Sequence, residues 1–74
     1  MKNFEVKIGM WGKILSGKNA GMFVFVQDDA PEGGFVIFQS PERLIEKGFD
    51  NWVETFDGVS KFFQFAGWDI EWLP

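Results

Sequence analysis

The stretch MFVFVQDDAPEGGFVIF, residues 22–38, decides the fold. It holds two apolar runs, residues 22–26 and 35–38, which are rich in β-branched and aromatic side chains and too short for helices. The segment between them combines acids, a proline and two glycines, which is typical of a hairpin connection longer than a two-residue turn. The two runs therefore predict adjacent antiparallel strands at the centre of a sheet. Because each run is continuously apolar, we expect both faces of these strands to be covered.

The segment before residue 22 predicts further strands. Apolar and basic residues alternate up to residue 8, and glycines interrupt the pattern that follows. We therefore expect one strand around residues 3–8 and another around residues 11–16, or one long bent strand over both. Residues 16–21 combine Ser, Gly, Lys and Asn, and this composition predicts a turn that leads into the first apolar run.

The segment after residue 38 predicts a short helix and a short strand. Ser40 is a good N-cap and Pro41 suits the first helical position, so we expect a helix of at most two turns over residues 41–47. Gly48 can end this helix. Residues 52–54 then predict a short extended piece.

The longest predicted helix covers residues 56–66. Its apolar side chains recur at i, i+3, i+4 and i+7 and form one face, made by Val59, Phe62, Phe63 and Ala66. Thr55 or Asp57 can cap its start, and Gly67 can stop it. Phe65 lies off the apolar face, so it either packs under the short segment 41–47 or contacts a partner.

The C-terminal residues 68–72 alternate with period two and predict a half-buried strand with an acidic outer face. The apolar set is Trp68, Ile70 and Trp72, and the acidic set is Asp69 and Glu71. The predicted class is thus α+β, a small antiparallel β-sheet with one helix (about 56–66) packed on a face and a C-terminal strand. At this length we expect a single domain over residues 1–74.

The composition excludes most chemistry. The chain has no His, Cys or Tyr, so it lacks the usual ligands of structural zinc, the cysteines of a disulfide framework and the common catalytic bases and thiols. No glycine-rich phosphate motif is present. We therefore expect no enzyme activity, no catalytic residue, no metal site and no cofactor. The chain has no apolar run of membrane-spanning length and its first five residues lack a signal-peptide pattern, so a cytoplasmic protein without a membrane contact is expected.

The charge is distributed unevenly. Residues 1–27 carry four lysines and one glutamate, whereas residues 28–74 carry ten acids and three basic residues. Such an asymmetry predicts either an acidic face for a basic partner or an ordinary solvated surface. The acids of two predicted loops do not follow the calcium-loop pattern and otherwise suit turns and caps. Together with one tryptophan they are the candidate partner-binding residues: Asp28, Asp29, Glu32, Asp50, Trp52, Glu54 and Asp57.

The aromatic residues divide between core and surface. We expect a core position for the phenylalanines of the two apolar runs, Phe23, Phe25, Phe35 and Phe38. Trp52 fits either the core or a partner contact, because tryptophan is the commonest type of interface hot spot. Trp11 is the aromatic residue of the chain that fits an exposed position best.

Four pieces of the chain carry a family resemblance. They are GMFVFVQDD at residues 21–29, GGFVIF at 33–38, GFDNWVE at 48–54, and FF at 62–63 followed by WDIEWL at 68–73. Together they resemble small immunity proteins of bacterial polymorphic-toxin systems, over about residues 12–73. The resemblance implies a stoichiometric inhibitor that binds a cognate toxin domain, often a nuclease with a basic cleft. An acidic surface would steer onto such a cleft quickly, with Asp69 and Glu71 as further contributors of charge.

Two other classes of function remain open. The chain could be a structural or assembly protein that forms a homodimer through an exposed strand edge. It could also bind single-stranded nucleic acid by stacking bases on aromatic side chains. A net charge of −4 and a single arginine argue against nucleic acid, because that affinity depends on neutralising phosphates.

Overall fold

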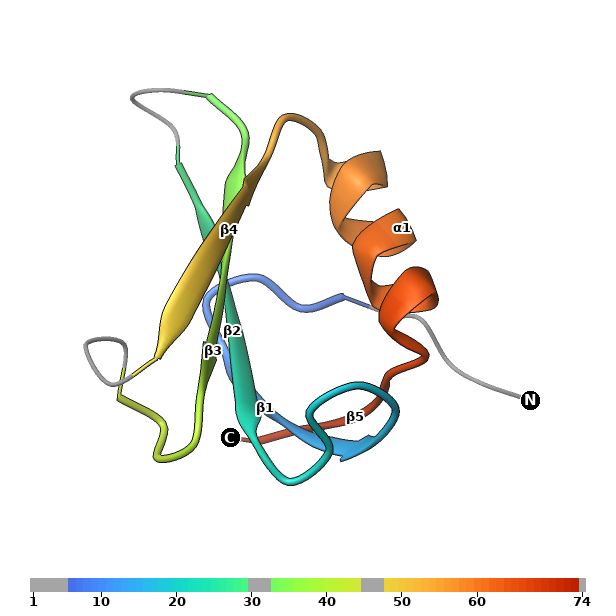
Figure 1. Ribbon diagram of the computed structural model, residues 1–74. Helices are drawn as coiled ribbons and strands as arrows, with labels where there is room; N and C mark the ends of the chain where they lie inside the picture. Colours follow the sequence, from blue (N-terminus) through green and yellow to red (C-terminus); the bar gives the residue numbers. More distant parts are fainter. Residues whose placement is uncertain (1–5, 30–32, 45–47, 74) are drawn as a thin grey trace.

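The computed structural model describes residues 6–29, 33–44 and 48–73, and within these ranges an antiparallel sheet carries one helix on one of its faces (Figure 1). The elements are β1 (Trp11–Ser16), β2 (Phe23–Asp28), β3 (Phe35–Ser40), β4 (Phe49–Val53), α1 (Phe56–Ala66) and β5 (Asp69–Trp72). This confirms the α+β class, the central pairing of the two apolar runs and the helix that packs on the sheet.

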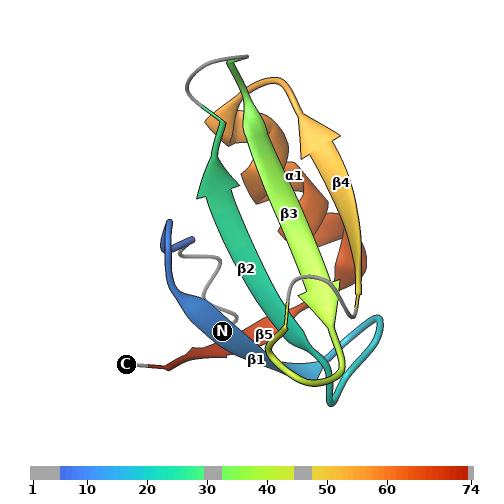
Figure 2. The same ribbon diagram turned by 90° about the vertical axis from the view of Figure 1, so that its left-hand side faces the viewer.

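The strand order is β4-β3-β2-β1-β5, and all neighbours are antiparallel. Strands β1, β2 and β3 each pair with the next strand along the chain. Helix α1 then returns the chain to the far side of the sheet, where β5 pairs with β1. Figure 2 shows the sheet from the face opposite α1, with β4 at one edge and β5 crossing behind β1. The two edges of the sheet are therefore β4 and β5.

The core lies between one face of the sheet and α1. Its fully buried apolar residues are Ile14, Val24, Val26, Ile37, Val59, Phe63 and Trp68. Val59 and Phe63 come from the predicted apolar face of the helix, and Ile70 and Trp72 pack against the same core from β5. The period-two interpretation of the last strand is thus confirmed.

Both ends of α1 are capped as the sequence predicts. The Thr55 hydroxyl accepts a hydrogen bond from the backbone N–H of Gly58 at 3.0 Å, and this satisfies one of the unpaired donors of the first turn. Gly67 follows the helix with φ 69°, a left-handed conformation that glycine adopts without steric cost. These two residues fix the length of the helix.

The expectation that both faces of β2 and β3 are covered is wrong. Helix α1 covers one face, and the apolar side chains that β2 and β3 carry on the opposite face, here called the open face, are half-buried. In β2 and β3 the open face carries Phe23, Phe25, Val36 and Phe38, so three of the four phenylalanines expected in the core lie there. Large rings shield one another when packed side by side, as Trp11 and Phe25 do with ring centroids 5.2 Å apart. An apolar run therefore does not require a second covering layer.

Two predicted elements also differ. Within residues 6–8 of the expected first strand, pairing is limited to an isolated parallel bridge between Ile8 and Val26, because Gly9 turns the chain with φ 75°. Residues 41–44 form a turn instead of a helix. Arg43 has φ 59°, which a right-handed helix cannot accommodate. Residues 3–5 and 45–47 lie outside the described residues.

Ser40 explains why the sequence resembles a helix start. Its buried hydroxyl accepts hydrogen bonds from the backbone N–H groups of Glu42 at 3.2 Å and Leu44 at 3.4 Å. A serine side chain satisfies the donors of a turn in the same way as those of a helix N-terminus. The cap chemistry is present, but the helix does not follow.

Candidate functional site

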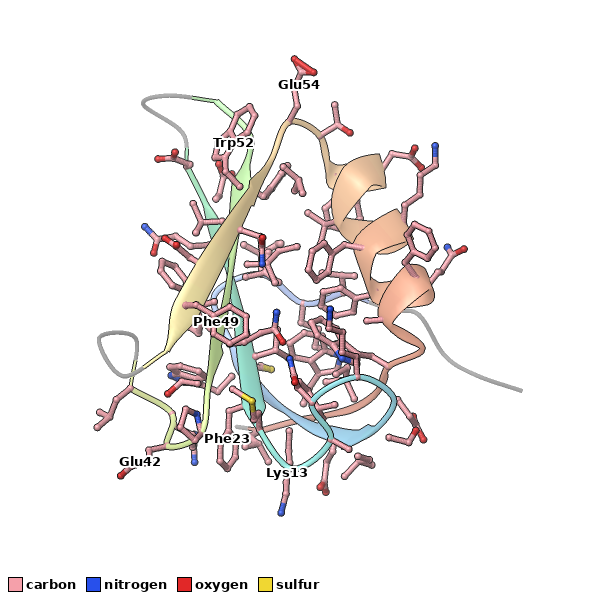
Figure 3. All side chains as sticks on the ribbon, in the orientation of Figure 1. Lys13, Phe23, Glu42, Phe49, Trp52 and Glu54 are labelled. Carbon is pink, nitrogen blue, oxygen red and sulfur yellow. The ribbon has the colours of Figure 1, made fainter. Side chains whose placement is uncertain are left out.

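Acids from two distant segments lie at the same end of the sheet. Strands β2 and β4 are both antiparallel to β3, so their C-terminal ends lie together. Asp28 is the last residue of β2 and Asp29 follows it, and Trp52 and Glu54 flank Val53, the last residue of β4. These four residues are called the acidic end. In Figure 3, Trp52 and Glu54 lie at this end of the molecule, and Lys13 lies at the opposite end.

Trp52 holds the acidic end together. Its indole N–H donates a hydrogen bond to the carbonyl oxygen of Gly33 at 3.1 Å, which links β4 to the connection between β2 and β3. Gly34 has φ 84°, and a Cβ there would lie 2.6 Å from the Cζ2 atom of Trp52, so the indole needs a glycine beside it. The Trp52 side chain is nevertheless 54% exposed. The sequence allowed either a core or a surface position for Trp52, and the structure shows the surface position.

The other predicted site residues are placed differently. Asp50 lies on the open face of β4, opposite Phe38 and two residues from Trp52. Asp57 lies in the first turn of α1, where it forms an exposed ion pair with Lys61 at 3.1 Å. Its negative charge also interacts favourably with the positive N-terminal end of the helix dipole. Glu32 lies outside the described residues. The acids of β5, Asp69 and Glu71, lie at the opposite edge of the sheet from β4.

A cleft of about 570 Å³ lies beside β4 on the helix side of the sheet. Phe49 and Asn51 line it from β4, and Phe62 and Phe65 line it from α1. Its wall includes Gln39, which is only 3% exposed and whose Oε1 atom accepts a hydrogen bond from Asn19 Nδ2 at 2.9 Å. The sequence interpretation missed this cleft, and the position of Phe65 off the helical apolar face was the one signal of it.

The exposed large aromatic side chains are concentrated on two elements. Among the described residues they are Phe49, Trp52, Phe56 and Phe65, and all four belong to β4 or α1. Phe65 is 96% exposed. Trp11, expected to be exposed, is half-buried against Phe25 on the open face. Phe49 and Phe65 line the same cleft, and exposed aromatic residues that share a cleft favour a binding surface, whereas scattered ones need no explanation.

The described part of the chain contains no group of three or more Asp, Glu, His or Cys side chains that could hold a metal ion. Over the same residues, no helix combines the length and the apolar character that a membrane span requires. We compared the chain with protein-family models, with curated proteins and with solved structures, and none of them matches it.

Proposed function

We propose that this protein is a non-catalytic binding module of the immunity type, which neutralises a basic toxin domain in the bacterial cytoplasm by binding it at the acidic end. The observation that carries the proposal is the hydrogen bond from Trp52 to Gly33. It joins β4, which Glu54 follows, to the connection that begins at Asp29, and it fixes an exposed indole at this end of the sheet.

This arrangement has the two properties that fast and tight binding of a basic protein requires. Carboxylates on one surface attract a basic partner over a distance and raise the association rate. An exposed tryptophan supplies a large contact area, and it loses little conformational freedom when its hydrogen bond already fixes the ring. The net charge of −4 acts in the same direction.

Self-association is the second candidate function. It is favoured by the open face, whose half-buried aromatic side chains would be covered by a second copy. A stable dimer at micromolar concentration without a bound foreign protein would support this function. Light scattering on the purified protein distinguishes the two candidates.

The proposed function is tested by charge reversal in matched pairs. The tagged chain is used to capture partners from its source lysate at low and high salt, and the affinity of the purified partner is then measured. We expect Asp28→Lys with Asp29→Lys to weaken binding by about tenfold or more and to flatten its salt dependence.

The double variant Asp69→Lys with Glu71→Lys is the control, because it makes the same change in net charge at the opposite edge of the sheet. We expect it to change the affinity by less than about threefold. Equal losses in the two double variants, or a partner whose activity is unchanged at a 1:1 ratio, would overturn the proposal.

A further inference from the structure

We propose that the partner binds as an additional β-strand along the free edge of β4, with alternate side chains on the open face and in the cleft. This inference rests on the proposed function, in which the chain binds a protein. It names the backbone and side-chain groups that would make the contact.

The hydrogen bonds of the sheet show which backbone groups of β4 are free. The N–H of Asp29 donates to the Gly34 carbonyl at 3.0 Å, and this contact sets the alternation of the β2–β3 ladder. In a regular antiparallel ladder, each residue directs both its N–H and its C=O to the same neighbour, and successive residues alternate. Because Gly34 bonds to β2, every second residue after it also bonds to β2. The residues of β3 that bond to β4 are therefore the intervening ones, Phe35, Ile37 and Gln39.

Their partners in β4 are Val53, Asn51 and Phe49, whose backbone groups therefore face β3. The N–H and C=O groups of Asp50 and Trp52 consequently face outward, at the free edge. The same alternation holds across the rest of the sheet. The N–H of Ile14 donates to the carbonyl oxygen of Met22 at 2.9 Å, and the N–H of Leu73 donates to the carbonyl oxygen of Trp11 at 2.8 Å.

Apart from the charge of Asp50, the edge of β4 within the described residues lacks the devices that usually block strand addition. Its register with β3 is regular over all five residues, and it contains no proline and no lysine. Its first four residues are exposed. The other edge, β5, is one residue shorter and pairs with β1 through a register shift between Ile14 and Ser16. Irregular and short edges resist pairing, so β4 is the edge that can accept a strand.

Strand geometry then defines the chemistry of the partner. Residues of the added strand opposite Asp50 and Trp52 would place their side chains on the open face, and the residue between them would point into the cleft beside Phe49 and Phe65. A cation suits the position opposite Asp50, and an apolar side chain suits the cleft. The partner segment therefore alternates basic and apolar residues.

A second copy of this chain fits the edge less well. Each copy carries a net charge of −4, so association opposes like charges. If two β4 strands paired antiparallel about Asn51, their two Asp50 carboxylates would lie at diagonal positions on one face, about 7 Å apart. A basic segment places a favourable charge there instead.

The test uses a synthetic peptide, acetyl-Lys-Val-Lys-Phe-Lys-amide, followed by NMR amide exchange in the full chain. We expect the outward amides of Asp50 and Trp52 to exchange rapidly in the free protein and to become protected at saturating peptide. Those of Asn51 and Val53 are protected throughout. Unchanged exchange at Asp50 and Trp52 with the peptide bound would overturn the proposal.

Two N-methylated peptides provide the matched control. One carries methyl groups on the three lysine amides, and the other carries them on the valine and phenylalanine amides. Because a strand bonds through alternate amides, we expect one version to lose at least about tenfold in affinity and the other to bind within about twofold. Equal affinity of the two versions would contradict strand addition.

Variants of Asp50 separate the edge from the charge. Asp50→Ala removes the carboxylate alone, whereas Asp50→Pro also removes the outward N–H and leaves the bonds to β3 in place. We expect Asp50→Pro to bind the peptide at least about fivefold more weakly than Asp50→Ala, with the β3–β4 contacts intact by NMR.

Equal peptide affinity of the two Asp50 variants would refute addition of the peptide as a strand. Protection of the Asp50 and Trp52 amides when the protein alone is concentrated would show that a second copy occupies the edge. If the variant Asp28→Lys with Asp29→Lys bound the partner as tightly as the unchanged protein, the acidic end would be refuted as the binding surface. The peptide test of strand addition would remain valid.

Discussion

The buried indole of Trp68 donates a hydrogen bond from Nε1 to the carbonyl oxygen of Lys18 at 2.6 Å, across 50 residues of sequence. Its ring also contacts that of Phe63 edge to face, with centroids 4.9 Å apart. We expect Trp68→Phe to lower the free energy of unfolding by about 2–4 kcal/mol, since it removes both the donor and part of the core volume. Urea denaturation measures the loss. Trp11→Phe, on the open face, is the control and should cost less than about 1.5 kcal/mol; equal losses would contradict the central role of Trp68.

Gly33 and Gly34 form a matched pair with different surroundings. Both have positive φ, but a Cβ at Gly33 would meet no atom within 4 Å, whereas one at Gly34 would press on Val53 and Trp52. We therefore expect Gly33→Ala to cost about 1 kcal/mol from backbone strain alone, and Gly34→Ala to cost at least about 1 kcal/mol more. Only Gly34→Ala should alter the chemical shift of the Trp52 indole proton. Similar spectra and stabilities would show that the indole does not rest on Gly34.

The N-cap of α1 predicts a specific order of stabilities. Thr55→Ala removes the side-chain oxygen that accepts the Gly58 N–H, and it should lower the free energy of unfolding by about 1 kcal/mol. Thr55→Ser retains an acceptor and should restore most of this loss. If Ser and Ala prove equivalent in thermal unfolding, the hydroxyl does not cap the helix.

Phe63 and Phe65 test whether exposure reflects function. Phe63→Ala should cost about 3–5 kcal/mol because this ring is buried in the core. Phe65→Ala should change stability by less than about 0.5 kcal/mol, because its ring is almost fully exposed. If Phe65 lines the binding cleft, the same variant should weaken binding of the lysine-containing peptide. Unfolding curves together with peptide titrations of both variants decide this.

The helix and the central strands were predictable because their signals are local. Thr55, the apolar face of residues 59–66 and Gly67 define α1 without reference to the rest of the chain. The alternation from Trp68 to Trp72 defines β5 in the same way. In each case the local pattern and the tertiary packing agree.

The open face and the free edge of β4 were not predictable, because they depend on strand order. Sequence alone does not say that β5 pairs with β1 and leaves β4 free at the opposite edge. It also does not say that Trp52 reaches Gly33, 19 residues away, and so stays at the surface. The failed helix after Ser40 has a different cause, since a serine that begins a turn and one that begins a helix look alike in sequence.

The pairing of β1 with β5 also has a consequence for the order of folding. Strands β1 to β4 meet through short connections, whereas Gly12 meets Trp72 only after some 60 intervening residues have been brought together. Contacts between such distant residues form late and slow the folding of small domains. Substitutions in the β2–β3 hairpin should therefore change mainly the folding rate, and those in β5 mainly the unfolding rate. We therefore expect β5 to be the first strand to separate from the sheet when the protein unfolds.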